Sequence, residues 1–233
     1  MQDRVLVFDV WGDYAHFRKI YTTTSPLTYS FPPRTAISGI VGAIAGLSKD
    51  EYFRYFFRDR ASIGCRILEP VKKVRIGENL IDTKKSMQRI INRTQIRFEF
   101  LKDPVYRIYF GHSDGRLFRD LREMLEEHRC VYTPCLGLSQ LVCNFKFVGE
   151  WSMRRCGDEF QEINSVVPLR SLLEPPEFEE GREYFSEVMP CVMGEGREVM
   201  DYSEILYERN GGSIKARTRD AWELENGERI VFI

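Results

Sequence analysis

The sequence has 233 residues, of which 43% are hydrophobic and 30% charged. This composition is typical of a globular chain with one sizeable core, and it excludes a collagen, a disordered chain and a disulfide-rich miniprotein. The 34 basic and 35 acidic side chains nearly cancel, which argues against a nucleic-acid binder that works alone. No apolar run approaches the roughly 20 residues that span a bilayer, and residues 1–8 lack a leader pattern, so we expect a cytoplasmic protein without membrane contact.

The first predicted elements are a buried strand over 4–10, dense in Val, Leu and Phe, and a helix that begins after the prolines at 32–33. Gly39, Gly42 and Gly46 interrupt this helix, at a cost of about 1 kcal/mol each. They therefore need a compensating reason, such as a close approach of the helix to a sheet or a ligand. The apolar side chains of the helix recur at three- and four-residue spacing: Ile37, Ile40, Val41, Ile44 and Leu47.

The middle of the chain predicts strands and a second helix. Residues 62–74 form one extended segment, and 95–101 pairs with 105–110 as a hairpin around the turn at 102–104. A strand over 141–148 follows the second helix. The apolar face of that helix carries Leu117, Leu121, Met124, Leu125 and His128, the last as a core or half-buried histidine.

The order strand, helix, strand, strand, helix, strand predicts an α+β fold, with a ferredoxin-like or RRM-like domain over 1–150. The insertion at about 70–100 is longer than such a fold needs and predicts a projecting β-hairpin arm. Residues 151–233 predict an acidic linker and a small β-rich subdomain, with hairpin turns at 210–212 and 226–227.

Charge is distributed unevenly along the chain. Residues 174–208 carry eleven acidic against two basic side chains, which indicates either a solvated face or a surface for a basic neighbour. Residues 71–100 reverse the sign, with three acidic side chains and eight basic ones, so this arm is predicted to bind a polyanion through its phosphates. The eight are Lys72, Lys73, Arg75, Lys84, Lys85, Arg89, Arg93 and Arg97.

Hydroxyl, aromatic and basic side chains crowd the loop between the first strand and the first helix. Unstacked bases pack on aromatic faces, and a helix N-terminus with an arginine and hydroxyls favours phosphate. An ordinary capped helix below a polar loop is the alternative. No Gly-Lys-Ser/Thr follows the glycines, which excludes a P-loop. The predicted RNA contacts here are Tyr14, His16, Arg18, Lys19, Tyr21, Thr22, Thr23, Ser25, Arg34, Thr35 and Ser38.

Four motifs within residues 7–46 resemble the N-terminal signature of the fifth CRISPR-associated protein family. They read W-G-D-Y-A-H-F-R-K, T-T-T-S-P-L-T-Y, F-P-P-R-T-A and G-x-x-G-A-I-x-G, and residues 133–139 (T-P-C-L-G-L-S) are similar to a later turn of that family. The resemblance implies an RRM-like domain with a thumb hairpin, in the type I interference complex Cascade. It further implies a cap on the 5′ end of the CRISPR guide RNA, beside the backbone and large subunits, with target DNA reached only through the complex.

One branch of that family resembles a metal-independent endoribonuclease with a Tyr, Lys and His group. The candidates here are His16, Tyr14, Lys19 and His112, but that group does not match this chain residue by residue. We therefore expect a non-catalytic subunit. A stand-alone RRM-type protein is the second alternative, although residues 95–100 lack the glycines of the RNP1 motif.

The six cysteines include no C-x-x-C motif, so we expect reduced, mostly buried thiols. A zinc site on His128, Cys130 and Cys135 is a minor alternative. The sequence predicts neither a metal nor another cofactor.

Overall fold

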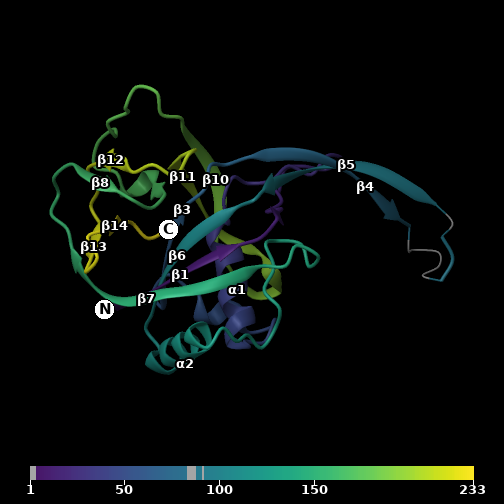
Figure 1. Ribbon diagram of the computed structural model, residues 1–233, viewed down its shortest axis with the longest axis horizontal. Coiled ribbons are helices and arrows are strands. Elements are labelled where there is room, and N and C mark those ends of the chain that lie inside the picture. The colour runs from purple at the N-terminus through teal and green to yellow at the C-terminus, as the bar shows by residue number, and fades with distance from the viewer. Residues whose placement is uncertain (1–3, 83–87, 91) are drawn as a thin grey trace.

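The computed structural model describes residues 4–82, 88–90 and 92–233, and a six-stranded antiparallel sheet forms its centre (Figure 1). The strand order is β14 (Arg229–Ile230), β13 (Trp222–Leu224), β7 (Asn144–Arg155), β1 (Arg4–Trp11), β6 (Val105–His112) and β3 (Ala61–Ile67). Helices α1 and α2 lie together on one face of the sheet. No described helix is long and apolar enough to cross a membrane. The main elements are β1 (Arg4–Trp11), α1 (Arg34–Ala45), β3 (Ala61–Ile67), β6 (Val105–His112), α2 (Gly115–Glu126) and β7 (Asn144–Arg155).

Apart from the inserted arm and short segments, these elements follow the predicted order β-α-β-β-α-β. Successive side chains of β1 point to opposite faces of the sheet, and both faces are buried. Leu6 and Phe8 join the main core, in which the apolar face of α1 packs, whereas Val5 and Val7 belong to a second cluster on the other face. The apolar spacing of α1 is confirmed, since Ile37, Ile40, Val41 and Ile44 are all buried.

The second helix begins where Asp114 caps it, with its carboxylate accepting from the backbone N–H groups of Arg116 and Leu117. Its apolar face is confirmed by the burial of Leu117 and Leu121. The prediction for His128 is wrong. It lies beyond the end of the helix with φ of 52°, is exposed, and stacks its ring on Phe145 at 4.7 Å.

The C-terminal part of the chain extends the same sheet. The predicted hairpin turn at 226–227 is confirmed, since it joins β13 (Trp222–Leu224) to β14 (Arg229–Ile230), and β13 pairs with β7. Strand β7 runs through residue 150, where we placed the domain boundary. The second hydrophobic cluster, which covers the sheet face opposite the helices, combines residues from both ends of the chain: Val5, Val7, Tyr109, Leu224 and Ile230.

A network of charged and polar side chains lies beside this cluster, on the same face of the sheet. Glu228 accepts hydrogen bonds from Arg66 at 2.6 Å, Arg107 at 3.2 Å and the Tyr109 hydroxyl at 3.1 Å. Arg107 also donates to both carboxylate oxygens of Asp9, at 2.8 and 3.2 Å. The sheet face on which RRM proteins stack bases is therefore largely covered in this chain.

The remaining C-terminal strands pair among themselves. The hairpin β10 (Tyr184–Met193) and β11 (Val199–Glu208) carries β9 (Val167–Pro168) on its edge, and β8 (Gln161–Ile163) pairs with β12 (Ile214–Ala216). The predicted hairpin at 210–212 is wrong, because β11 and β12 belong to different sheets. The described residues also include three short 3-10 helices: Tyr52–Tyr55, Leu169–Ser171 and Glu195–Arg197.

The predicted basic insertion contains two long paired strands, β4 (Lys73–Ile81) and β5 (Arg93–Lys102), which extend away from the body (Figure 1). We call residues 73–102 the arm. The short strand β2 (Tyr14–Ala15) pairs with the base of β5. The predicted hairpin around 102–104 is wrong, because β5 pairs within the arm while β6 pairs with β1 and β3. The predicted extended segment at 62–74 likewise contains parts of two strands. Residues 62–67 belong to β3 in the central sheet, and residues 73–74 belong to β4 in the arm.

Candidate nucleic-acid interface

The two faces of the arm differ in chemistry. The strand register places Lys73, Arg75, Arg93 and Arg97 on one face, together with Glu99. Glu99 lies 3.7 Å from the Lys73 ammonium and 4.0 Å from the Arg75 guanidinium. Within the described ranges Arg93 and Arg97 form no ion pair, and both are exposed. This basic face therefore offers cations for a polyanion toward the tip of the arm.

The other face of the arm is mainly apolar, with Glu78 and Thr94 also on it, and its base packs on the body. It carries Val74, Ile76, Leu80, Ile96, Phe98 and Phe100. Near the base, Tyr14 contacts Phe100 edge-on at 6.1 Å, and the His16 ring lies 5.4 Å from Phe98 and 5.6 Å from Phe100. Two predicted RNA contacts thus pack against the arm instead of facing solvent.

His16 is 1% exposed, and its Nδ1–H donates to the backbone carbonyl of Glu99 at 2.7 Å. The other ring nitrogen, Nε2, is buried without a hydrogen-bond partner. Burial, the largest effect, lowers the pKa of His16 from 6.5, against an opposing contribution from the bond to Glu99. His16 is therefore a neutral side chain that joins the loop to the arm.

This burial predicts a pH dependence of stability. The unfolded chain binds a proton at His16 near pH 6.5, whereas the folded state resists protonation until its lower pKa is reached. The unfolded state then holds more protons, so the free energy of unfolding falls as the pH drops below about 6.5. Urea unfolding of wild type and His16→Gln at about pH 7 and about pH 5 checks this, because glutamine retains an N–H donor but does not titrate. Equal losses in both proteins contradict the prediction.

Lys19 is held by the acidic C-terminal segment. Its ammonium lies 2.8 Å from the carboxylate of Glu187, and 5.6 Å from the ring centre of Tyr29. Burial lowers the pKa of Lys19, but the bond to Glu187 outweighs burial and the net direction is upward. The same carboxylate accepts from the backbone N–H of Ser30 at 2.9 Å. Sequence reasoning missed Glu187, because 168 residues separate it from Lys19.

The expectation that Arg34 offers its guanidinium to phosphate is not supported by its position. Arg34 is 1% exposed and donates to the carbonyls of Phe56 at 2.6 Å, Ala61 at 2.7 Å and Cys191 at 3.1 Å. Burial, the largest effect, lowers its pKa to about 10. Arg34 thus joins the start of α1 to three other segments. An arginine after two prolines at a helix start predicts a bound partner, and in the structure that partner is a set of backbone carbonyls instead of a phosphate.

The helix N-terminus is also closed to a ligand. Ser38 is buried and donates to the carbonyl of Arg34 at 2.9 Å, and Thr35 is half-buried. Pro33, at the N-cap, is buried and forms no side-chain cap. The predicted phosphate site at this end of α1 is therefore replaced by packing.

Other candidates remain accessible beside the arm. Arg18, Tyr21, Thr23 and Ser25 are exposed, whereas Thr22 is buried. Lys72 and Arg89 are also exposed, and Lys84 and Lys85 lie outside the described residues. Further hydrogen bonds join the loop to the base of the arm. Lys73 donates to the carbonyl of Thr28 at 3.1 Å, the backbone N–H of Glu99 donates to the carbonyl of Pro26 at 3.0 Å, and the backbone N–H of Thr28 donates to the Glu99 carboxylate at 3.3 Å. The exposed loop thus borders the base of the arm.

The proposed catalytic group is not assembled in the structure. His112 is 1% exposed, and both ring nitrogens have backbone partners. Its Nε2–H donates to the carbonyl of Tyr55 at 2.7 Å, and its Nδ1 accepts from the N–H of Asp114 at 3.0 Å. His112 therefore fixes the start of α2, while His16 and Lys19 have the separate partners described above. No hydrogen bond or ion pair joins these three described side chains to one another.

The sequence also predicts reduced, mostly buried thiols and, as a minor alternative, a zinc site on His128, Cys130 and Cys135. All six cysteines are free; Cys65, Cys143 and Cys191 are buried, and Cys130 is exposed. Among the residues that the structure describes, no group of three or more His, Cys, Asp or Glu side chains is placed to hold a metal ion.

Residues 5–137 match the family model described as CRISPR-associated protein (Cas_Cas5). The comparison with curated proteins finds no match. Solved structures with a similar fold include a CRISPR protein from Archaeoglobus fulgidus, with a TM-score of 0.58 and 15% identity over 98% of this chain and 99% of that chain. A chain of a CRISPR RNA-guided surveillance complex gives 0.53 and 12% identity, over 91% of each chain. A chain of a type III-B Cmr-beta complex gives 0.53 and 11% identity, over 92% and 86%.

Proposed function

Because the chain belongs to the CRISPR-associated family Cas_Cas5, we propose that it is a non-catalytic subunit of a type I Cascade complex in antiviral defence. In this role it binds and caps the 5′ repeat-derived end of the guide RNA in the cytoplasm. The backbone and large subunits are its protein neighbours, and target DNA is reached through the assembled complex.

The observation that carries this proposal is the basic face of the arm. Arg93 and Arg97 are exposed there without an ion pair in the described ranges, and the exposed side chains of residues 18–25 lie beside its base. Such a surface suits a single strand, which is bound by cations along its backbone and by aromatic faces such as Tyr21. The covered sheet directs RNA to this surface instead of to the strands.

The overall charge supports joint binding. A formal net charge of -1 gives little general attraction to RNA. A subunit with one basic arm on a near-neutral body therefore suits a site that neighbouring subunits complete.

The test is to incubate the full chain with 5′-labelled cognate repeat RNA in chelator, and to run native and denaturing gels. We expect a shifted band that contains intact RNA. A discrete cleavage product supports the nuclease alternative and contradicts the proposal. If the chain alone gives no shift, the assay is repeated with the backbone and large subunits; failure of that assembly to protect the 5′ end also contradicts it.

A further inference from the structure

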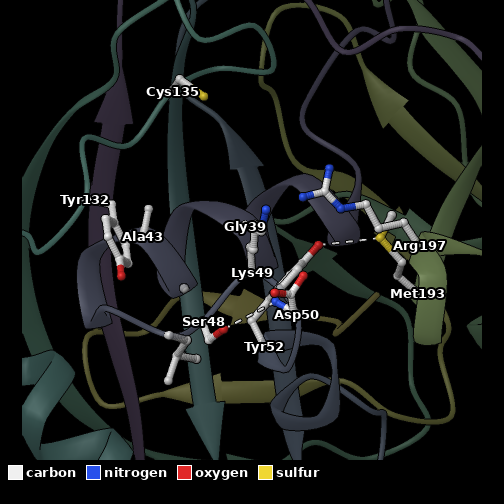
Figure 2. A pocket seen from close by; sticks show the side chains of 12 residues that line it. Gly39, Ala43, Ser48, Lys49, Asp50, Tyr52, Tyr132, Cys135, Met193 and Arg197 are labelled. Atoms are coloured by element: carbon white, nitrogen blue, oxygen red, sulfur yellow. Dashed lines mark hydrogen bonds between the residues drawn. The ribbon is translucent and has the colours of Figure 1, made fainter.

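A pocket of about 730 Å³ opens beside α1, outside the interface described above (Figure 2). Its volume lies within the range of about 300–1,000 Å³ that is typical of ligand sites. Glycines of the helix, two tyrosines and two cations line it, and the residues that matter below are Gly39, Gly42, Lys49, Tyr52, Tyr132 and Arg197.

The glycines of α1 differ in how far protein packing explains them. Gly46 ends the helix with φ of 74°, and a Cβ there would lie 2.7 Å from Val131. A Cβ on Gly42 would lie 3.6 Å from Tyr52, an ordinary contact. A Cβ on Gly39 would meet nothing within 4 Å. Glycine is unfavourable in a helix interior, and the packing around Gly39 does not explain why this position is a glycine. Gly39 borders the pocket.

Two aromatic rings line the pocket. Tyr52 is half-buried, and its hydroxyl donates to the sulfur of Met193 at 3.4 Å, which fixes the ring. Tyr132 is 54% exposed, and its backbone N–H donates to the carbonyl of Ala43 at 3.0 Å. Figure 2 shows Tyr132 beside Ala43, with Tyr52 nearer Met193 and Arg197. The backbone bond keeps Tyr132 at the helix, so an aromatic face is available beside the glycines.

Two cations border the same space. Lys49 and Arg197 are exposed, and in the described part of the chain neither forms an ion pair. Asp50 is the acidic residue among the lining side chains. Burial raises the pKa of Tyr52, and the charge of Arg197, which lines the same pocket, opposes that rise. Aromatic faces and a local excess of positive charge favour a planar anionic ligand over an apolar protein side chain.

We propose that this pocket binds one unstacked nucleotide of single-stranded RNA, with its base beside Gly39 and Tyr132 and its phosphate at Lys49 and Arg197. The inference rests on the proposed function and adds a base-binding site to it. The open space above Gly39 lets a flat base approach the helix backbone, which a larger side chain would prevent.

The test measures the affinity of the full chain for a fluorescent random-sequence RNA octamer and for an abasic octamer of ribose phosphate, by anisotropy. We expect Gly39→Leu, which fills the pocket, to weaken binding of the RNA octamer by roughly 10-fold, the effect of about one lost stacked base. Its affinity for the abasic octamer stays unchanged, because that ligand has no base. Lys49→Glu weakens both, and the matched control Arg119→Glu on α2 weakens neither.

Two results of the affinity measurements with Gly39→Leu overturn the proposal. One is an unchanged affinity of Gly39→Leu for the RNA octamer. This result overturns the proposal even if the variant impairs the assembly of the protein with other subunits. The other is an equal loss for both octamers. Wild-type binding of the two octamers separates these results from a failure of the proposed function. Wild type that binds neither octamer, both alone and together with the backbone and large subunits, contradicts both proposals, whereas binding of both octamers with an inert Gly39→Leu overturns the pocket alone.

A stability measurement separates the pocket from a packing defect. Gly39→Ala removes a helix glycine where a Cβ meets nothing, so we expect the melting temperature to rise by roughly 2–4 °C. The same variant should bind the RNA octamer more weakly than wild type. A lower melting temperature would mean that Gly39 has a packing role, and it would overturn the argument from open space.

Discussion

Arg34→Met is expected to destabilise the protein by about 3 kcal/mol, because it leaves three buried carbonyls without a donor. The guanidinium bonds of Arg34 reach Phe56, Ala61 and Cys191. Part of the loss is offset, since methionine removes a buried cation that has no acidic hydrogen-bond partner among the described residues. Thermal unfolding should show a fall in melting temperature of roughly 6–12 °C.

The matched control is Arg58→Met. Arg58 is partly exposed and bonds to Asp201 at 2.7 Å, an arrangement that contributes at most about 1 kcal/mol. Arg34→Lys should fall between wild type and Arg34→Met, since one ammonium retains the charge but cannot span three carbonyls. Equal melting temperatures for wild type and Arg34→Met would show that the three bonds contribute nothing.

The double variant Arg93→Glu, Arg97→Glu is expected to weaken RNA binding by roughly 10- to 100-fold at low salt. Both cations lie on the basic face of the arm and are exposed. Each phosphate contact with a single strand contributes about 0.7 to the slope of log affinity against log salt, so the slope should fall by about 1.4. Titrations of a labelled RNA between about 50 and about 200 mM salt measure both quantities.

Arg116→Glu, Arg119→Glu on α2 is the control, because it makes the same change in net charge on an exposed helix. If the arm binds phosphates, the control changes affinity much less than the arm variant. Equal losses in the two variants would mean that only the net charge of the protein matters, and the arm would lose its role as an interface.

The elements that the sequence predicts well are those whose pattern is local. The apolar spacing of α1 and of residues 117–125 needs no knowledge of partners, and both helices form there. The unusual length of the segment at 70–100 likewise predicts an insertion from connection lengths alone. The prediction of the turn at 226–227 is correct for the same reason, because the two strands that it joins are adjacent in sequence and in the sheet.

Strand pairing and burial depend on distant residues, and there local patterns fail. The segments flanking 102–104 resemble a hairpin, yet one pairs with β4 and the other with β1 and β3. Arg34 and His16 are polar residues at the end of and within a polar loop, but distant segments bury both: those of Phe56, Ala61 and Cys191 bury Arg34, and the arm buries His16. The link from Lys19 to Glu187 joins opposite ends of the chain. None of these contacts leaves a periodic signal.

The second hydrophobic cluster, which buries the face of β1 opposite the helices, has a consequence for biosynthesis. Val5 and Val7 leave the ribosome before Leu224 and Ile230, which cover them and follow about 220 residues later in the chain. At about 5–20 residues per second, roughly 10–45 s separate these events. During that interval the nascent sheet exposes an apolar face and an unpaired edge, both of which favour aggregation. Chaperone binding or slowed translation near residue 220 should therefore change the yield of folded protein more than its final stability.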